Sequence, residues 1–127
     1  MYAISMMLNA RRLETIARES EGIKAQLGQI GVVRPGSLTR QYKDPENQVG
    51  GYYQLSYTHR MKSRTAYVRA SFATQVRQQI RAYKKLKQLI AKWVALGIEH
   101  SQLSMQLRAR DEASQPTARR RGRRGRS

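Results

Sequence analysis

Between residues 47 and 98 the sequence contains ten Lys and Arg residues and no Asp or Glu. A segment without carboxylates cannot neutralise its own charge through internal ion pairs. Its fold must therefore depend on apolar packing and backbone hydrogen bonds, and its charge must be balanced by counterions or by a polyanion. This imbalance is the strongest indication of function in the sequence.

The two flanking segments differ from this centre and from each other. Residues 1–46 hold seven basic and five acidic residues, and residues 99–127 hold eight basic and three acidic residues. Six Arg residues fall in the last nine positions, and such a run of like charges interrupted by Gly does not fold alone. We therefore expect one folded domain over residues 1–110 and a disordered Arg-rich tail over residues 111–127.

The composition excludes several classes of protein. Only 39% of the 127 residues are hydrophobic, which permits a small core. The absence of Cys excludes disulfide scaffolds, thiolate zinc sites and cysteine nucleophiles. No apolar segment is long enough to span a bilayer, and the N-terminal apolar run precedes its Arg residues, the wrong order for a signal peptide. We expect a cytoplasmic protein that associates with the nucleoid or with a ribonucleoprotein.

The inventory of reactive side chains predicts no enzyme, metal or cofactor. His59 and His100 are far apart in the sequence, and the eight carboxylates are too scattered for a two-metal site. No Gly-rich phosphate loop with its Lys is present. Tyr67 lies between Arg64 and Arg69 and could be imagined as a nucleophile, but so small a chain cannot supply a whole recombinase site.

Two helices are predicted. Apolar residues in heptad registers indicate a first helix over about Ile4–Leu27, with Gly28 as its C-cap. A second helix is expected from Ser71, an N-cap, past Gly97 to about Leu107. Its apolar residues occupy one half of the surface, and the opposite half gathers basic residues, namely Arg77, Arg81, Lys84, Lys85 and Lys92.

Between these helices we expect a small antiparallel sheet. Residues 31–51 contain so many Gly and Pro residues that only short extended pieces are predicted, at Val32–Val33 and Leu38–Tyr42, with a turn at residues 44–47. Tyr52–Thr58 and Ser63–Arg69 predict a β-hairpin around a four-residue turn, residues 59–62.

The hairpin register follows from placing Thr58 opposite Ser63. One face then carries the apolar side chains, with Arg64 at its rim, and the other face is polar. The apolar face requires cover, which a helix would supply, so the predicted fold class is α+β. The apolar set is Tyr53, Leu55, Tyr57, Ala66 and Val68.

We expect two kinds of contact with a nucleic acid, while a merely solvated basic helix and a merely wet sheet face remain alternatives. Side chains expected to contact phosphates are Arg60, Lys62, Arg64, Arg77, Arg81, Lys84, Lys85, Arg119, Arg120, Arg121, Arg123, Arg124 and Arg126. Side chains expected to contact base edges or to stack on bases are Tyr52, Gln54, Thr65, Tyr67 and Arg69.

Over about residues 30–96 the order of short motifs resembles a family of small bacterial and archaeal domains of unknown function. The motifs are Pro35–Leu38, Gly51–Ser56, Lys62–Val68 and Ile80–Leu89. Members of that family are often encoded near transposases or integrases, so the resemblance implies an accessory product of a mobile element. Many members carry a cysteine cluster that implies a zinc knuckle, but Gln41–Gly50 has no Cys. The resemblance therefore implies a member without this metal.

The sequence thus predicts a non-enzymatic nucleic-acid-binding protein, with DNA favoured over RNA, serving a mobile element as an accessory or regulator. An RNA-binding subunit of a ribonucleoprotein is the first alternative. The second is a helical adaptor that docks on a recombinase-type partner or on a second copy through an exposed stripe of Trp93, Leu96, Leu103 and Leu107. A basic helix can also lie on an anionic membrane, but the flanking hairpin and tail disfavour a membrane partner.

Overall fold

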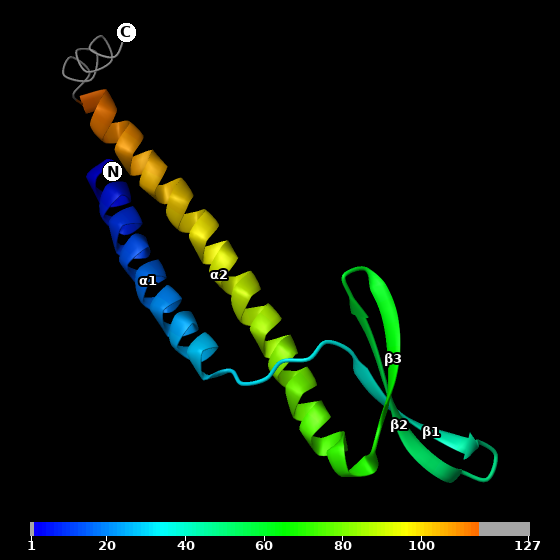
Figure 1. The fold of residues 1–127 in the computed structure, drawn as a ribbon. Coiled ribbons are helices and arrows are strands. Elements are labelled where there is room, and N and C mark those ends of the chain that lie inside the picture. The colour runs from blue at the N-terminus through cyan, green and yellow to red at the C-terminus, as the bar shows by residue number, and fades with distance from the viewer. Residues whose placement is uncertain (1, 115–127) are drawn as a thin grey trace. The chain divides into compact units, whose positions relative to one another are not determined.

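A computed structural model describes residues 2–114 of the chain (Figure 1). In sequence order, one helix precedes a three-stranded sheet and a second helix follows it. The predicted α+β class is therefore confirmed. The six tail arginines expected to contact phosphate, Arg119, Arg120, Arg121, Arg123, Arg124 and Arg126, lie outside the described residues. The elements are α1 (Tyr2–Gln29), β1 (Ser37–Asp44), β2 (Val49–His59), β3 (Lys62–Val68), a 3-10 turn (Ala70–Phe72) and α2 (Ala73–Ser114).

The chain divides into two compact units. One unit, here the helix-pair unit, comprises Met1–Ala25 and Ala91–Ser127. The other, here the sheet unit, comprises Gln26–Ile90 and contains all three strands together with the first part of α2. Each unit has its own buried residues, and each is described by itself.

The sheet of the sheet unit is antiparallel, with strand order β1-β2-β3. The register between β2 and β3 is the predicted one, with Thr58 opposite Ser63 and Leu55 opposite Ala66. A buried face specifies such a register, because a slip of one residue would turn every apolar side chain to solvent.

β1 is longer than the short piece expected there, whereas Val32–Val33 forms no strand. The start of β1 at Ser37 depends on Gly36, which precedes it. Gly36 has a φ of +126°, a conformation that glycine adopts readily and other residues rarely adopt. A Cβ at this position would come within 2.6 Å of the Ser56 carbonyl oxygen. Gly36 thus lets the chain enter β1 directly against β2, where Ser37 lies opposite Ser56.

The core of the sheet unit is formed where α2 covers one face of the sheet. Leu55 and Val68 pack there against Val76 and Ile80 of α2, and each of the four is at most 7% exposed. The predicted helix cover over the apolar face is therefore confirmed. Three partly buried side chains extend this core, namely Leu38, Tyr53 and Tyr57.

The two turns of the sheet differ in how well they were predicted. The turn between β1 and β2 is confirmed, and Asn47 donates to the Asp44 carboxylate at 2.9 Å through its side chain. This hydrogen bond, together with one from the Asn47 backbone, holds the pKa of Asp44 below its ordinary value. The predicted four-residue turn between β2 and β3 is wrong, because His59 and Lys62 already pair across the strands.

Two helix ends also differ from prediction. Gly28 is not a C-cap, since α1 continues to Gln29. Ser71 is not the N-cap of the second helix, because it lies inside the 3-10 turn, where the Phe72 amide donates to the Arg69 carbonyl at 2.9 Å. As expected, α2 continues past Gly97, and its 42 residues reach Ser114.

In the helix-pair unit α1 and the distal part of α2 lie side by side (Figure 1). Ile16, Ile23 and Leu96 are buried, with 1%, 3% and 6% of their surfaces exposed. The burial of Leu96 corrects the expectation that it forms part of an exposed stripe. Arg12 donates two hydrogen bonds to the Glu99 carboxylate, at 2.6 and 2.8 Å, and these hold the pKa of Glu99 below its ordinary value.

Candidate nucleic-acid interface

The positive charge of the described chain is concentrated in the sheet unit. Residues 26–90 contain twelve basic residues and two acidic ones, Asp44 and Glu46. None of the twelve basic side chains forms an ion pair with a described carboxylate, because the ion pairs found between described residues join Arg12 to Glu99 and Lys24 to Glu21. The sheet unit therefore presents an uncompensated charge to its surroundings.

Three arginines of the sheet unit lie over tyrosine rings. The Arg77 guanidinium is 5.2 Å from the centre of the Tyr53 ring, and the Arg40 guanidinium is 5.7 Å from the same ring. Arg34 lies over Tyr57 at 5.3 Å. Such contacts hold a cation in place but cancel none of its charge, so the guanidinium groups stay attractive to an anion.

Three of the cations predicted to contact phosphate lie along one groove. Arg77, Arg81 and Lys84 follow each other on α2 at four- and three-residue spacing, which places them on one side of the helix. The opposite wall is the start of β1. We call this hollow, of about 290 Å³, the cationic groove; its lining is Gly36, Ser37, Leu38, Arg77, Ile80, Arg81 and Lys84.

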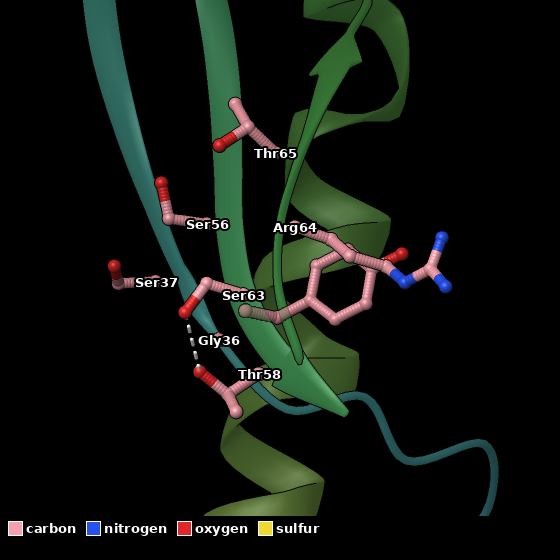
Figure 2. Close-up of a pocket in the computed structure, with 8 residues that line it drawn as sticks. Gly36, Ser37, Ser56, Thr58, Ser63, Arg64 and Thr65 are labelled. Atoms are coloured by element: carbon pink, nitrogen blue, oxygen red, sulfur yellow. Dashed lines mark hydrogen bonds between the residues drawn. The ribbon is translucent and has the colours of Figure 1, made fainter. Parts of the chain in front are cut away.

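The face of the sheet turned away from α2 is rich in hydroxyl groups. Figure 2 shows the hydroxyls of its Ser and Thr residues on one side of the strands, while the Arg64 guanidinium extends to the other. Thr58 and Ser63 lie 3.5 Å apart through their hydroxyl oxygens. We call this second hollow, of about 500 Å³, the hydroxyl pocket; its lining is Gly36, Ser37, Ser56, Tyr57, Thr58, Ser63, Arg64 and Thr65.

The cationic groove and the hydroxyl pocket share two lining residues. Gly36 and Ser37 belong to both, so the two hollows meet at the beginning of β1. The cationic groove offers three cations, and the hydroxyl pocket offers neutral hydrogen-bonding groups with one cation, Arg64. This combination suits a ligand with a charged backbone and polar substituents beside it.

Four of the five residues predicted to contact bases lie together. Gln54 pairs directly with Tyr67 across β2 and β3, and Thr65 is two residues from Tyr67 on the same face. The rings of Tyr52 and Tyr67 are 6.0 Å apart and tilted by 38°. The fifth, Arg69, falls beyond the end of β3 and lines a hollow that it shares with Tyr67.

Other predicted phosphate ligands are not gathered by the fold. Arg60 and Lys62 lie at the tip of the β2–β3 hairpin and line neither the cationic groove nor the hydroxyl pocket. Arg64 lies opposite Tyr57 and lines the hydroxyl pocket, but its guanidinium extends away from the hydroxyl groups. Lys85 is exposed on α2 and does not line the cationic groove.

Sequence reasoning missed Ser37 and Arg34 as parts of the surface. The available signal for Ser37 was the alternation of polar and larger residues directly after Gly36, which indicates a strand. Arg34 gave no such signal. Its backbone amide donates to the Gln79 carbonyl at 3.1 Å, a contact between distant parts of the sequence that only the folded chain reveals.

Neither a metal site nor a membrane-spanning helix is found among the described residues. Among residues 2–114, no group of three His, Asp or Glu side chains is arranged to hold a metal ion. No helix in this described range is both long enough and apolar enough to cross a membrane.

Comparisons with known proteins found no match for this chain. No family model matches the sequence, and neither a curated protein nor a solved structure does. The resemblance to a mobile-element family therefore stays a prediction.

Proposed function

We propose that this protein binds nucleic acid without catalysing a reaction, and that the sheet unit is the binding element. In this proposal the cationic groove holds consecutive phosphates of one strand. The hydroxyl pocket and the face around Gln54 and Tyr67 lie against the sugars and bases of that strand. Support comes from the uncompensated charge of residues 26–90 and from the hydrogen-bonding face beside it.

One observation carries the proposal. Arg77, Arg81 and Lys84 share a groove with the Ser37 hydroxyl and have no carboxylate partner in the described chain. Three like charges on one side of a helix repel one another, by up to a few tenths of a kcal/mol per adjacent pair. A chain of phosphates would convert that repulsion into attraction and would release counterions on binding.

The test replaces the three cations together, as Arg77→Gln, Arg81→Gln and Lys84→Gln. A matched control removes the same charge from the helix-pair unit, as Arg11→Gln, Arg18→Gln and Lys92→Gln, at three exposed positions. Affinity for a labelled DNA duplex and for a labelled single strand is measured by fluorescence anisotropy over a range of salt concentrations.

We expect the groove variant to flatten the dependence of log affinity on log salt by about 3 on a duplex, because each neutralised phosphate contributes roughly 0.9. The control should change the slope much less. Equal losses in both variants would show that net charge alone attracts the nucleic acid, and the proposed site would be wrong.

The role of the protein in a mobile element, and the preference for DNA over RNA, are proposals of a different kind. They rest on the resemblance over residues 30–96 and not on the geometry of the groove. Sequencing of the nucleic acid that copurifies with the protein from its native host separates the alternatives. Enrichment of one DNA site supports the first proposal, whereas one discrete RNA supports a ribonucleoprotein subunit.

A further inference from the structure

A third hollow of the sheet unit lies along the opposite edge of the sheet from the cationic groove. The groove borders β1, and this hollow borders the end of β3 and the first turns of α2. Its volume of about 460 Å³ lies within the range of small-molecule sites. We call it the base pocket; its lining is Arg34, Tyr67, Val68, Arg69, Phe72, Gln75, Val76 and Gln79.

Two aromatic side chains of the base pocket are open to solvent. Phe72 is 51% exposed and Tyr67 is 68% exposed. The sequence assigned Phe72 to the apolar half of the second helix, but the 3-10 turn before α2 removes it from the core. The Tyr67 ring contacts the Tyr52 ring at 6.0 Å, and both the Phe72 and the Tyr67 rings still present exposed apolar surface at this hollow.

Polar groups surround these rings. Gln75 and Gln79 are one helical turn apart, and neither side-chain amide has a hydrogen-bond partner among the described residues. Arg34 and Arg69 supply two cations, and no carboxylate lines the pocket. The Arg34 backbone is fixed beside α2 through its hydrogen bond to the Gln79 carbonyl.

We propose that the base pocket holds one unpaired nucleobase of a nucleic-acid strand. Phe72 and Tyr67 stack on the base, and the amides of Gln75 and Gln79, which both donate and accept, hydrogen-bond its edge. Arg34 and Arg69 hold the phosphates on either side. The proposal rests on the proposed function and deepens it, because it names single-stranded nucleic acid as the ligand.

The requirement for an unpaired base follows from geometry. In a duplex both faces of each base are covered by neighbouring bases, so side-chain rings can stack only on bases that have left the helix or never joined one. Tyr67 also lies 6.0 Å from Tyr52 and opposite Gln54. A single strand could therefore continue from the base pocket over Tyr67 onto the polar face of the sheet.

The experiment compares wild-type protein with Phe72→Leu, which keeps apolar volume but removes the aromatic face, and with Phe72→Tyr, which restores it. Met61→Leu is the control, because Met61 is 97% exposed at the hairpin tip. The probes are labelled oligo(dT), oligo(U) and a blunt DNA duplex of equal length, at one salt concentration. A single strand with one 2-aminopurine reports stacking through its fluorescence.

We expect Phe72→Leu to weaken single-strand binding about 10-fold, since stacking of one base is worth about 1–3 kcal/mol. Duplex binding should stay unchanged, and Phe72→Tyr should restore both affinity and 2-aminopurine quenching. A preference between oligo(dT) and oligo(U) then shows which of the two single strands, DNA or RNA, is bound more tightly.

Two results would overturn the base pocket while leaving the proposed function intact. One is that Phe72→Leu binds all probes like wild type, and the other is that it weakens duplex and single strand equally. Failure of the proposed function has a different signature, because the Arg77, Arg81 and Lys84 variant would then bind every probe as the charge-matched control does.

Discussion

The two units of this protein differ in the balance between their basic and acidic residues. The described part of the helix-pair unit, residues 2–25 and 91–114, holds seven basic and six acidic residues. Two ion pairs are found there, one between Arg12 and Glu99 and one between Lys24 and Glu21. The sheet unit holds twelve basic and two acidic residues, and three of its arginines, Arg34, Arg40 and Arg77, lie over tyrosine rings.

This difference separates charge that serves the fold from charge that is left for a ligand. An ion pair satisfies both of its partners within the chain, and in the described part of the helix-pair unit basic and acidic residues are nearly equal in number. In the sheet unit folding leaves the charge unsatisfied, and stability must come from the apolar core. Substitutions should therefore affect the two units through different physical terms.

The largest effect is expected from Leu55→Ala in the sheet unit. Leu55 is fully buried at the centre of a small core, and such truncations cost about 2–5 kcal/mol in the free energy of unfolding. Urea unfolding is followed by near-UV circular dichroism of the tyrosines and by fluorescence of Trp93, the single tryptophan, which lies in the helix-pair unit.

We expect the tyrosine signal to shift more than the Trp93 signal. Coincident shifts would show that the two units unfold as one. That result would contradict the expectation that a substitution in one unit affects it separately from the other. Met61→Ala, at an almost fully exposed position, should leave both signals near their wild-type midpoints.

The same replacement of Gly by Ala should have opposite signs in the two units. Gly36→Ala forces a Cβ to within 2.6 Å of the Ser56 carbonyl oxygen at a φ of +126°, so we expect a loss of about 1–3 kcal/mol. Gly22 lies inside α1 with nothing within 4 Å of an added Cβ. Gly22→Ala should stabilise by about 0.5–1 kcal/mol, because Ala is the better helix former. Thermal unfolding measures both, and a stable Gly36→Ala variant would contradict the strained entry into β1.

A smaller gain is expected at the tip of the β2–β3 hairpin. Arg60 and Met61 form a two-residue turn with φ of +51° and +65°, where side chains other than Gly are disfavoured. Met61→Gly should stabilise the sheet unit by about 0.5 kcal/mol through relief of this conformation. Met61→Ala keeps the unfavourable φ and should give no gain in the same denaturation experiment.

The smallest effect concerns the pH dependence of the helix-pair unit. The hydrogen bonds from Arg12 lower the pKa of Glu99 in the folded protein. The ion pair therefore stabilises the folded state fully at pH values above 4.5, the ordinary pKa of this carboxyl group. This stabilisation is lost as the pH falls through the lower folded pKa.

Glu99→Gln should therefore lower the melting temperature slightly at neutral pH and by less in strong acid. Trp93 fluorescence during heating at several pH values measures this. An undiminished difference in acid would mean that Glu99 acts through packing and not through its charge.

Parts of the candidate site could be predicted because local pattern specified them. The alternation in β2 and β3 placed Gln54, Thr65 and Tyr67 on one face, and helical spacing placed Arg77 and Arg81 on one side of α2. Arg69 could not be placed, since the strand ends one residue before it and the chain turns there. Phe72 could not be recognised as exposed, because the 3-10 turn that takes it out of the core has no clear sequence signal.

The sequence by itself determined the uncompensated charge, the α+β class and the β2–β3 register, because composition and the two-residue period act over short distances. Tertiary structure alone decided that Ser37 lies beside Arg77, Arg81 and Lys84, and that Arg34 lies beside Phe72. These neighbours come from separate segments, and their meeting depends on how β1 and the preceding residues pack against β2 and α2. Packing of that kind is a property of the assembled surfaces, which no local window of sequence contains.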